Sequence, residues 1–255
     1  MNVAVVGGTG MLGRHVAREL RERGHEVRIL SRRSPDHRVD LTTGEGLVSC
    51  LAGCDVVVDA SNDSSTHAAW TLVEGTARLA AAEVTAGVRH HVGVSVVGCE
   101  RVPMGYFRVK AEQERAVERG AVPWSLVRAT QFHEHAAAML ASAARWRAVP
   151  LPRARIETVS CAEVARVVAD VAEGPPRRGR VTVAGPEVVA VREVARTWRA
   201  LTGRRALLIP VPLPGRAGRA LRAGALTAER PDIRGTTRFE PWLAAQRQGR
   251  ASSPA

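Results

Sequence analysis

The stretch that decides the fold is NVAVVGGTGMLG, residues Asn2–Gly13, near the start of the 255-residue chain. An apolar run of strand length leads directly into glycines, and the next segment, MLGRHVARELRERG, carries apolar residues at helical spacing. The glycines follow the pattern GxxGxxG at Gly7, Gly10 and Gly13, with Gly8 as an additional glycine. The sequence therefore predicts a strand, a tight glycine turn and a helix.

A turn of this kind can hold a dinucleotide. Missing side chains let the backbone approach a pyrophosphate, and the following helix points its free N–H groups and its dipole at that charge. Three spaced glycines also serve an ordinary tight turn, so the position between a strand and a helix carries the argument. The predicted cofactor-binding residues of the turn are Gly7, Thr9, Gly10, Met11, Leu12 and Gly13.

Strand-like and helix-like segments alternate along the chain after this turn. The later predicted strands are EVRILSR, CDVVVDAS, HHVGVSVVG and WSLVRAT, and helical segments separate them. Such alternation implies right-handed crossovers and a doubly wound, mostly parallel sheet with helices on both faces. The near-continuous apolar character of the strands agrees with burial on both sides. The predicted fold class is therefore α/β, of Rossmann type.

The expected organisation is one NAD(P)-binding domain over residues 1–245. Proline becomes frequent in AVPLPRAR and IPVPLPGRAG, which indicates irregular connections. Residues 135–155 and 185–245 are expected to contribute a small C-terminal substrate lobe. The end of the chain, residues 246–255, is expected to be a disordered tail.

Composition limits the class of protein. Hydrophobic residues make up 45% of the chain, which suits a sizeable core, and no apolar run is long enough to span a membrane. The N-terminus lacks the basic flank and cleavage site of a signal peptide, so a cytoplasmic protein is expected. The four cysteines contain no CxxC pair and are interpreted as small apolar residues in a reduced compartment.

The net charge of +12 raises the question of nucleic-acid binding. The arginines are scattered through all the predicted helices, aromatic residues are only 4% of the chain, and no stacking platform is visible. The sequence therefore favours a small-molecule substrate over nucleic acid as the partner, and it leaves a homodimer open.

The end of the second predicted strand indicates which dinucleotide binds. An NAD site usually places an acidic residue there, about 20 residues after the glycines, to hold the ribose 2′-hydroxyl. This chain has Ser31, Arg32 and Arg33 instead. A hydroxyl and two guanidinium groups suit a 2′-phosphate, so we expect NADP(H) to be preferred over NAD(H). The alternative is two more surface arginines in an arginine-rich protein.

The segment GYFRVK contains the only tyrosine and the only lysine of the chain, Tyr106 and Lys110. On a helix, positions i and i+4 lie on one face. A nearby cation stabilises a phenolate and lowers the phenol pKa from its usual value of about 10. We expect Tyr106 to exchange a proton with a substrate oxygen, and Lys110 to tune that pKa and bind ribose hydroxyls. A surface lysine beside a half-buried tyrosine is the alternative.

Together, these motifs resemble the short-chain dehydrogenase/reductase superfamily. Within it the chain is most similar to the atypical or extended NmrA-like NAD(P)-binding group, through the phrases VEGTARL, AGVRHHVGVSVVG, GYFRVKAEQE and GAVPWSLVRATQF. The resemblance runs from Asn2 to about Leu243, nearly the whole chain. GxxGxxG combined with YxxxK is specific for the superfamily but not for a substrate.

The resemblance implies roles for particular residues. Tyr106 would be the acid–base residue and Lys110 its ribose-binding partner. Family members usually hold the substrate oxygen with a serine or threonine after the fifth strand, and Ser95 is the candidate here. The resemblance also implies that Asp40 and Leu41, after a third short strand, lie at the adenine. Ala60 and Ser61, after the fourth strand, would lie at the cofactor ribose. Thr130 and Gln131 would lie near the nicotinamide carboxamide, with Gln131 also facing the substrate.

The segment QFHEHA adds a further candidate. In a strand, His133 and His135 would share a face and could ligate a metal ion, but the sequence offers no third ligand, so no metal is predicted. We expect His133 to lie at the rim of a substrate pocket, with an exposed loop as the alternative.

These expectations combine into one leading function. It is an NADPH-dependent oxidoreductase that reduces a ketone, enone or quinone-like small molecule, with Tyr106 as the proton donor. Two alternatives remain, since relatives include non-catalytic NADP(H)-sensing regulators as well as epimerases and dehydratases. Leu72 replaces an asparagine that many relatives have before VEGT, which weakens the case for efficient catalysis.

Overall fold

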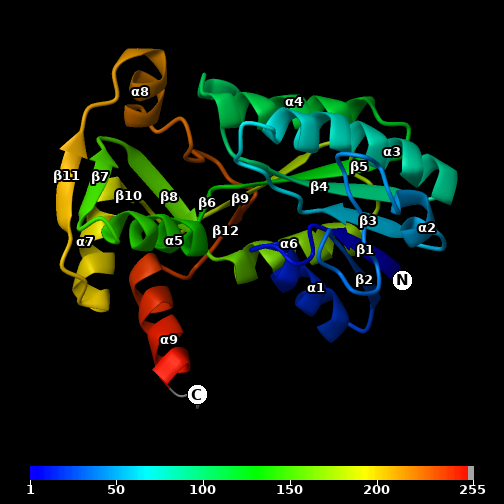
Figure 1. Ribbon diagram of the computed structural model, residues 1–255, viewed down its shortest axis with the longest axis horizontal. Helices are drawn as coiled ribbons and strands as arrows, with labels where there is room; N and C mark the ends of the chain where they lie inside the picture. Colours follow the sequence, from blue (N-terminus) through cyan, green and yellow to red (C-terminus); the bar gives the residue numbers. More distant parts are fainter. Residues whose placement is uncertain (252–255) are drawn as a thin grey trace. The chain divides into compact units, whose positions relative to one another are not determined.

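The computed structural model describes residues 1–251 of the chain (Figure 1). The chain divides into two compact units. The first unit contains Met1–Glu100, Met104–Arg128 and Cys161–Val181. The second contains Arg101–Pro103, Ala129–Ser160 and the described residues from Thr182 onward. The predicted substrate lobe, residues 135–155 and 185–245, falls within this second unit, which extends beyond it.

The first unit alternates strands and helices, as the sequence predicts. Its elements in chain order are β1 (Asn2–Val6), α1 (Gly13–Glu22), β2 (Glu26–Leu30), α2 (Leu47–Leu51), β3 (Val56–Asp59), η1 (Trp70–Glu74), α3 (Gly75–Ala86), β4 (His90–Val96), η2 (Cys99–Arg101), α4 (Gly105–Arg119), β5 (Trp124–Ala129), α6 (Cys161–Glu173) and the start of β9 (Arg180–Ala184).

These strands belong to a seven-stranded parallel sheet with the order β12-β9-β5-β4-β3-β1-β2. Within the first unit, α1 and α6 pack on one face of the sheet, while α2, α3 and α4 lie together on the other (Figure 1). The predicted Rossmann-type α/β fold is therefore confirmed. The strands β1, β3 and β4 are buried over most of their length, which explains their apolar sequences, whereas β2 is only partly buried.

The strand order reverses between β1 and β3, which both pair with parallel neighbours. In open α/β sheets the ligand crevice lies outside the carboxyl ends of the strands at such a reversal. The glycine turn after β1 and the residues Ala60 and Ser61 after β3 occupy this position. The topology thus places two of the predicted cofactor segments side by side.

One predicted strand is absent. Before Asp40 the structure has a single bridge, between Ser31 and Arg38, instead of the expected third short strand. The reason is local, because the Asp40 carboxylate accepts hydrogen bonds from the Thr42 backbone N–H at 2.8 Å and its hydroxyl at 2.6 Å. Such an Asx turn competes with extended backbone. β3 is therefore the third strand of the chain rather than the fourth.

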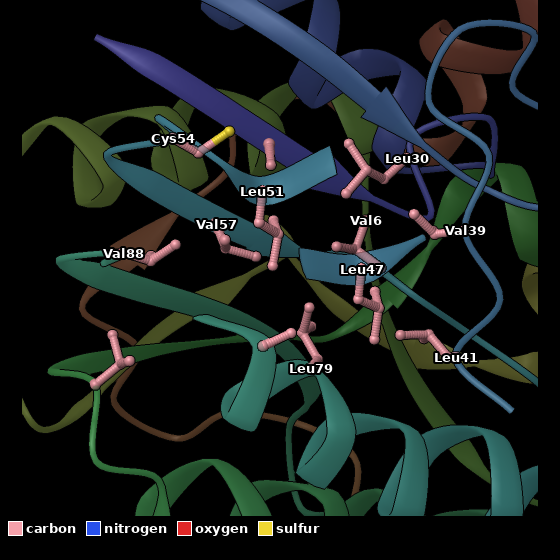
Figure 2. Close-up of a cluster of buried hydrophobic side chains, with 13 residues drawn as sticks. Val6, Leu30, Val39, Leu41, Leu47, Leu51, Cys54, Val57, Leu79 and Val88 are labelled. Carbon is pink, nitrogen blue, oxygen red and sulfur yellow. The ribbon is translucent and has the colours of Figure 1, made fainter. Parts of the chain in front are cut away.

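A buried apolar cluster holds α2 and α3 against the sheet (Figure 2). Val6 and Val57 come from β1 and β3, while Leu47, Leu51 and Leu79 come from the two helices. Burying each leucine contributes roughly 1.5–3 kcal/mol. The cluster fixes the helices that carry the polar groups described below.

The second unit has its own core. Its elements are β6 (Gln131–Phe132), α5 (His133–Ala144), β7 (Ala148–Pro152), β8 (Arg155–Val159), the end of β9, β10 (Val188–Ala190), α7 (Val191–Thr202), β11 (Leu207–Val211), α8 (Gly215–Arg222), β12 (Ile233–Arg234) and α9 (Phe239–Ala251). β10-β8-β6 form a three-stranded sheet, and β11 pairs with β7 in parallel. Trp198 is buried in this core and Trp242 packs against it.

The predicted disordered tail is wrong in part. α9 continues to Ala251, so residues 246–251 are helical. Residues 252–255 lie outside the described residues.

Two expectations from composition concern the described chain as a whole. None of the four cysteines forms a disulfide within residues 1–251, and three of them are buried, as expected of small apolar residues. Over the same residues, no helix combines the length and apolar character needed to cross a membrane.

A buried ion pair ties α4 to β5 in the first unit. The Glu114 carboxylate, almost fully buried, accepts two hydrogen bonds from the Arg128 guanidinium, at 2.9 and 2.5 Å. Burial alone would raise the pKa of Glu114, but the hydrogen bonds and charge of Arg128, together with Ser95 and the charge of Arg180, outweigh it, so that the pKa lies below its usual value. Such a bidentate pair is strongly coupled, and losing one partner leaves a buried charge.

We expect Glu114→Gln to destabilise the protein by about 3 kcal/mol at neutral pH, because Arg128 loses its counter-charge. A depressed carboxyl pKa adds stability above the unfolded value of 4.5, and this contribution is lost as pH falls through the folded value. The difference in the free energy of unfolding between wild type and variant should therefore become smaller below pH 4.5. Urea unfolding at a series of pH values measures it.

The matched control is Glu112→Gln, since Glu112 is exposed on the same helix. It removes the same charge without touching Arg128 and should leave stability nearly unchanged. Equal destabilisation by both variants would contradict this account of the pair.

Candidate functional site

The glycine turn is closed by backbone packing that only glycine permits. A Cβ on Gly13 would lie 2.3 Å from the Gly7 carbonyl oxygen, and one on Gly7 would lie 2.8 Å from that of Ala60. Gly7 has a φ of 71°, in the left-handed region, and the Gly10 N–H donates to its carbonyl at 2.8 Å. The turn is therefore pressed against both the start of α1 and the end of β3.

The outer side of this turn fits an anion. Thr9 and Gly10 are exposed, whereas Leu12 and Gly13 are buried. The first turn of α1 carries no acidic residue, and no side chain caps it within the described chain. The Arg14, His15 and Val16 N–H groups bond to the Gly10 and Leu12 carbonyls. The positive end of the helix dipole, beside the exposed turn, therefore faces a position that a phosphate group can occupy. The residues present fit the pyrophosphate of a dinucleotide.

The basic segment after β2 is exposed. Arg32 and Arg33 reach solvent, and the Arg33 N–H donates to the Ser31 hydroxyl at 3.1 Å. The hydrogen bond from Thr42 lowers the pKa of Asp40, and the charges of Arg32 and Arg38 lower it further. The Asp40 carboxylate therefore lies within the electrostatic reach of Arg32. The sequence has no acidic residue at the strand end and did not predict this.

The two residues expected at the adenine differ in exposure. Leu41 belongs to the buried apolar cluster, while Asp40 is half-buried at the beginning of its turn. Beside this turn the Trp70 indole donates to the Thr42 carbonyl at 3.1 Å and lies over the Arg78 guanidinium. The sequence did not predict that Trp70 lies beside this turn, because that contact depends on how η1 packs.

Ala60 and Ser61 follow β3 directly. The Ala60 N–H donates to the Val6 carbonyl at 3.0 Å, and the Ser61 N–H donates to the Asp59 carboxylate at 2.9 Å. Both residues are half-buried next to the glycine turn, since the Gly7 backbone approaches both of them. This position agrees with the implied role at the cofactor ribose.

Tyr106 lies in the first turn of α4 and is half-buried. Its hydroxyl donates to the Asn62 side-chain oxygen at 2.9 Å. Burial raises the pKa of Tyr106 to about 12, and the bond to Asn62 offsets only part of this. The expectation that Lys110 brings the phenol pKa down is therefore wrong for this structure.

The reason lies in where the Lys110 ammonium is held. It donates to the Val94 carbonyl at 2.9 Å and to the Gln113 side-chain oxygen at 2.5 Å, and no hydrogen bond joins it to Tyr106 within residues 1–251. Burial lowers the pKa of Lys110, and the charge of Asp59 works against that effect. The lysine is anchored to β4 rather than to the phenol.

A chain of buried polar groups extends from this lysine. The Gln113 amide donates to the Asp59 carboxylate at 3.2 Å and to the Thr76 hydroxyl at 3.1 Å. Four elements, β3, α3, α4 and β4, therefore meet through buried hydrogen bonds. Sequence reasoning missed Asp59, Thr76 and Gln113, although a carboxylate ending a buried strand and a glutamine three residues after Lys110 were visible signals.

Ser95 is buried in β4, one residue after the carbonyl that holds Lys110. In the described chain no hydrogen bond connects its hydroxyl with Tyr106. Its burial and its place on the strand are compatible with the implied position, but its role stays a prediction.

Thr130, Gln131 and His133 lie in the second unit. Thr130 is buried, and its hydroxyl accepts a hydrogen bond from the Gly185 N–H at 3.1 Å. Gln131 is half-buried in β6 and pairs with Thr158 of β8. The Thr130 hydroxyl therefore links the start of β6 to the end of β9, which the sequence did not predict.

His133 corrects a prediction. It begins helix α5, not a strand, so that His133 and His135 do not share a face. His133 is fully buried, bonds to the Thr237 carbonyl at 2.9 Å, and has ring neighbours Phe239 and Trp242. It is a core residue of the second unit rather than the rim of a substrate pocket.

A parallel sheet with a glycine turn at its order reversal defines a dinucleotide-binding protein of Rossmann type. The chain belongs to the NAD(P)H-binding family, because the family model of that description matches residues 7–175. The NAD(P)-binding family predicted from the sequence is therefore confirmed.

Two curated relatives are similar over most of the chain. The (4-alkanoyl-5-oxo-2,5-dihydrofuran-3-yl)methyl phosphate reductase of Streptomyces griseus subsp. griseus is 32% identical over 219 residues, which cover 79% of this chain and 74% of the relative. The NAD(P)H azoreductase of Xenophilus azovorans is 26% identical over 227 residues, covering 83% and 77%. Both are named as reductases.

A solved structure agrees in fold. The NADPH-dependent quinone oxidoreductase QOR2 of Escherichia coli, complexed with NADPH, superposes with a TM-score of 0.79 over 96% of this chain and 99% of that one. The two sequences are 16% identical, so the likeness shows the fold alone.

We expect Gly13→Ala to weaken NADPH binding by at least about tenfold, because the new Cβ would force the Gly7 carbonyl away and open the turn. NADPH fluorescence titration measures the affinity, and thermal unfolding reports on the fold. Gly179→Ala is the control, since its Cβ would come no nearer than 3.5 Å to its closest neighbour. Unchanged NADPH affinity in folded Gly13→Ala would contradict this assignment of the turn.

Proposed function

We propose that the protein is an NADPH-dependent oxidoreductase that reduces a ketone, enone or quinone-like small molecule, with Tyr106 as the proton donor. One observation carries the proposal: in a chain of the NAD(P)H-binding family, its only phenol is half-buried and held by Asn62. The names of the two curated relatives support a reduction.

The direction of the proton transfer follows from the pKa of Tyr106. The bound coenzyme would supply a hydride to the electron-poor carbon of the substrate. Reduction then requires a proton for the oxygen, and a phenol with a pKa of about 12 is protonated throughout the neutral range. Oxidation would instead require the phenolate, which burial disfavours. The environment of Tyr106 therefore supports reduction.

Asn62 positions the phenol. Its side-chain oxygen accepts the Tyr106 hydroxyl proton at 2.9 Å, so the O–H bond has a defined direction in the ligand-free chain. A substrate oxygen that takes over this hydrogen bond would receive the proton along it. Asn62 is thus a positioning residue.

Lys110 has capacity for one more acceptor. An ammonium group has three N–H donors, and the Val94 carbonyl and Gln113 take two of them. We assign the third to a hydroxyl of the nicotinamide ribose. In this role the lysine orients the coenzyme, and the buried chain through Gln113 to Asp59 keeps its side chain in place.

The preference for the phosphorylated coenzyme rests on Arg32 and Arg33. Both are exposed directly after β2, where a 2′-phosphate is bound in this fold. Asp40 is already engaged by two bonds from Thr42, so its carboxylate leaves the guanidinium groups available to a phosphate.

The names of the relatives indicate the kind of acceptor. One relative is named for a phosphate ester that carries an alkanoyl group and an oxo-dihydrofuran ring, and the other for azo reduction. Both descriptions imply a multiple bond, to oxygen or carbon in one case and between two nitrogens in the other, that can accept a hydride and a proton. We propose a small conjugated acceptor of this class.

A second function is an NADP(H)-sensing regulator without turnover. The observation in its favour is that the Lys110 ammonium lies on the Val94 carbonyl and does not acidify Tyr106. Such a protein would need the coenzyme site but not the phenol.

We expect Tyr106→Phe to lower the rate of NADPH oxidation by about 10²–10⁴-fold, the range typical of a lost general acid, and to leave the NADPH affinity unchanged. A panel of ketones, enones and quinones provides the acceptors. Arg108→Gln, an exposed change on the same helix, is the control.

Full activity of Tyr106→Phe with an acceptor that wild type reduces would overturn the role of the phenol. If wild type reduces no acceptor but binds NADPH and NADP⁺ with unequal affinity, the regulator is the better account.

A further inference from the structure

An open hollow in the second unit is lined by arginine. Its volume is about 860 Å³, and its basic lining residues are Arg147, Arg196, Arg199, Arg204 and Arg205. This volume is within the range of small-molecule sites, roughly 300–1,000 Å³. We call it the five-arginine hollow.

Three segments bring these side chains together. Arg196 and Arg199 are three residues apart on α7 and therefore share a helix face. Arg204 and Arg205 follow Gly203, whose left-handed φ of 66° ends the helix. Arg147 precedes β7, and its carbonyl accepts the Leu207 N–H at 2.9 Å, at the start of the parallel β7–β11 pair.

The charges of the hollow are not neutralised by the protein. In the part of the chain that the structure describes, no carboxylate lies within 4.0 Å of any of these five guanidinium groups, whereas Arg23, Arg128 and Arg234 each pair with at least one. Among the five, only Arg199 makes a side-chain hydrogen bond within residues 1–251, to the Ala206 carbonyl at 3.4 Å. The negative end of α7 offsets part of the repulsion for Arg199. The remaining like charges oppose one another.

The backbone at Arg147 adds a second cost. Its φ of 59° lies in the left-handed region, where a residue other than glycine is strained. Strain of this kind persists where the surrounding structure holds a side chain in a required place. At Arg147 it directs one more cation into the five-arginine hollow.

We propose that the five-arginine hollow binds a small anion with two or more phosphate groups. Guanidinium groups present paired donors that match phosphate oxygens, and several of them neutralise more than one phosphate. The inference is separate from the oxidoreductase proposal, because none of its residues belongs to the glycine turn or to the Tyr106 site.

A small polyphosphate fits better than a nucleic-acid strand. Binding a strand requires a basic track with aromatic side chains for the bases, and the hollow has no aromatic residue among its lining side chains. Trp146 next to it is exposed, but a single indole is not a track. The limited size of the hollow matches a short chain of phosphates.

The test uses the full chain and tripolyphosphate as the probe, with isothermal titration calorimetry as the measurement. Arg204→Gln combined with Arg205→Gln should weaken tripolyphosphate binding by at least about tenfold. Arg216→Gln combined with Arg219→Gln is the control, because it removes the same charge from exposed positions on α8. The control should bind within about twofold of wild type, and NADPH affinity should be the same in both double variants.

Three results would overturn the proposal. They are the absence of tripolyphosphate binding by wild type, an equal loss in both double variants, and binding of single-stranded DNA through the same arginines without binding of tripolyphosphate. Thermal unfolding of each variant confirms that the comparison is made between folded proteins.

Discussion

The Gly7 carbonyl oxygen lies only 2.3 Å from the point where a Cβ of Gly13 would stand, and the functional part of the first unit depends on this close approach. It holds the start of α1 directly over the end of β1, so the helix dipole points at the crevice where the strand order reverses. Because Gly7 also touches Ala60, the same contact sets the distance to β3. A side chain at either glycine would separate these three elements and remove the surface that a pyrophosphate needs.

A second constraint acts below the turn, where a buried lysine is satisfied by protein groups. Lys110, Gln113 and Asp59 form a hydrogen-bonded chain inside the first unit, and burying such groups is favourable only when each has a partner. The chain makes the lysine a fixed part of the scaffold. The environment of Tyr106 is instead set by burial, which raises its pKa, and by the hydrogen bond to Asn62, which offsets part of that effect. The lysine and the tyrosine are therefore held by separate contacts, and their proposed roles in orienting the coenzyme and donating a proton do not depend on a bond between them.

Features set by local pattern could be predicted from the sequence. The alternation of apolar strands with helices predicted the parallel sheet, and the glycine spacing predicted the turn, because these two features depend on residues close together in the sequence. Features that depend on distant partners could not. Two hydrogen bonds from Thr42 to the Asp40 carboxylate form a turn where a strand was expected. The Lys110 ammonium bonds to the Val94 carbonyl instead of the phenol, and His133 packs in a core with Phe239. The five-arginine hollow also needed the structure, since its members come from separate segments.

The central claim is that the glycine turn and the two arginines after β2 together bind a phosphorylated nicotinamide coenzyme. Its most direct test is the equilibrium titration of the purified wild-type protein with NADPH and, separately, with NADH. The account predicts that both bind and that NADPH binds at least about tenfold more tightly, since only NADPH offers a 2′-phosphate to Arg32 and Arg33. Tighter binding of NADH, or no binding of either coenzyme, would contradict it.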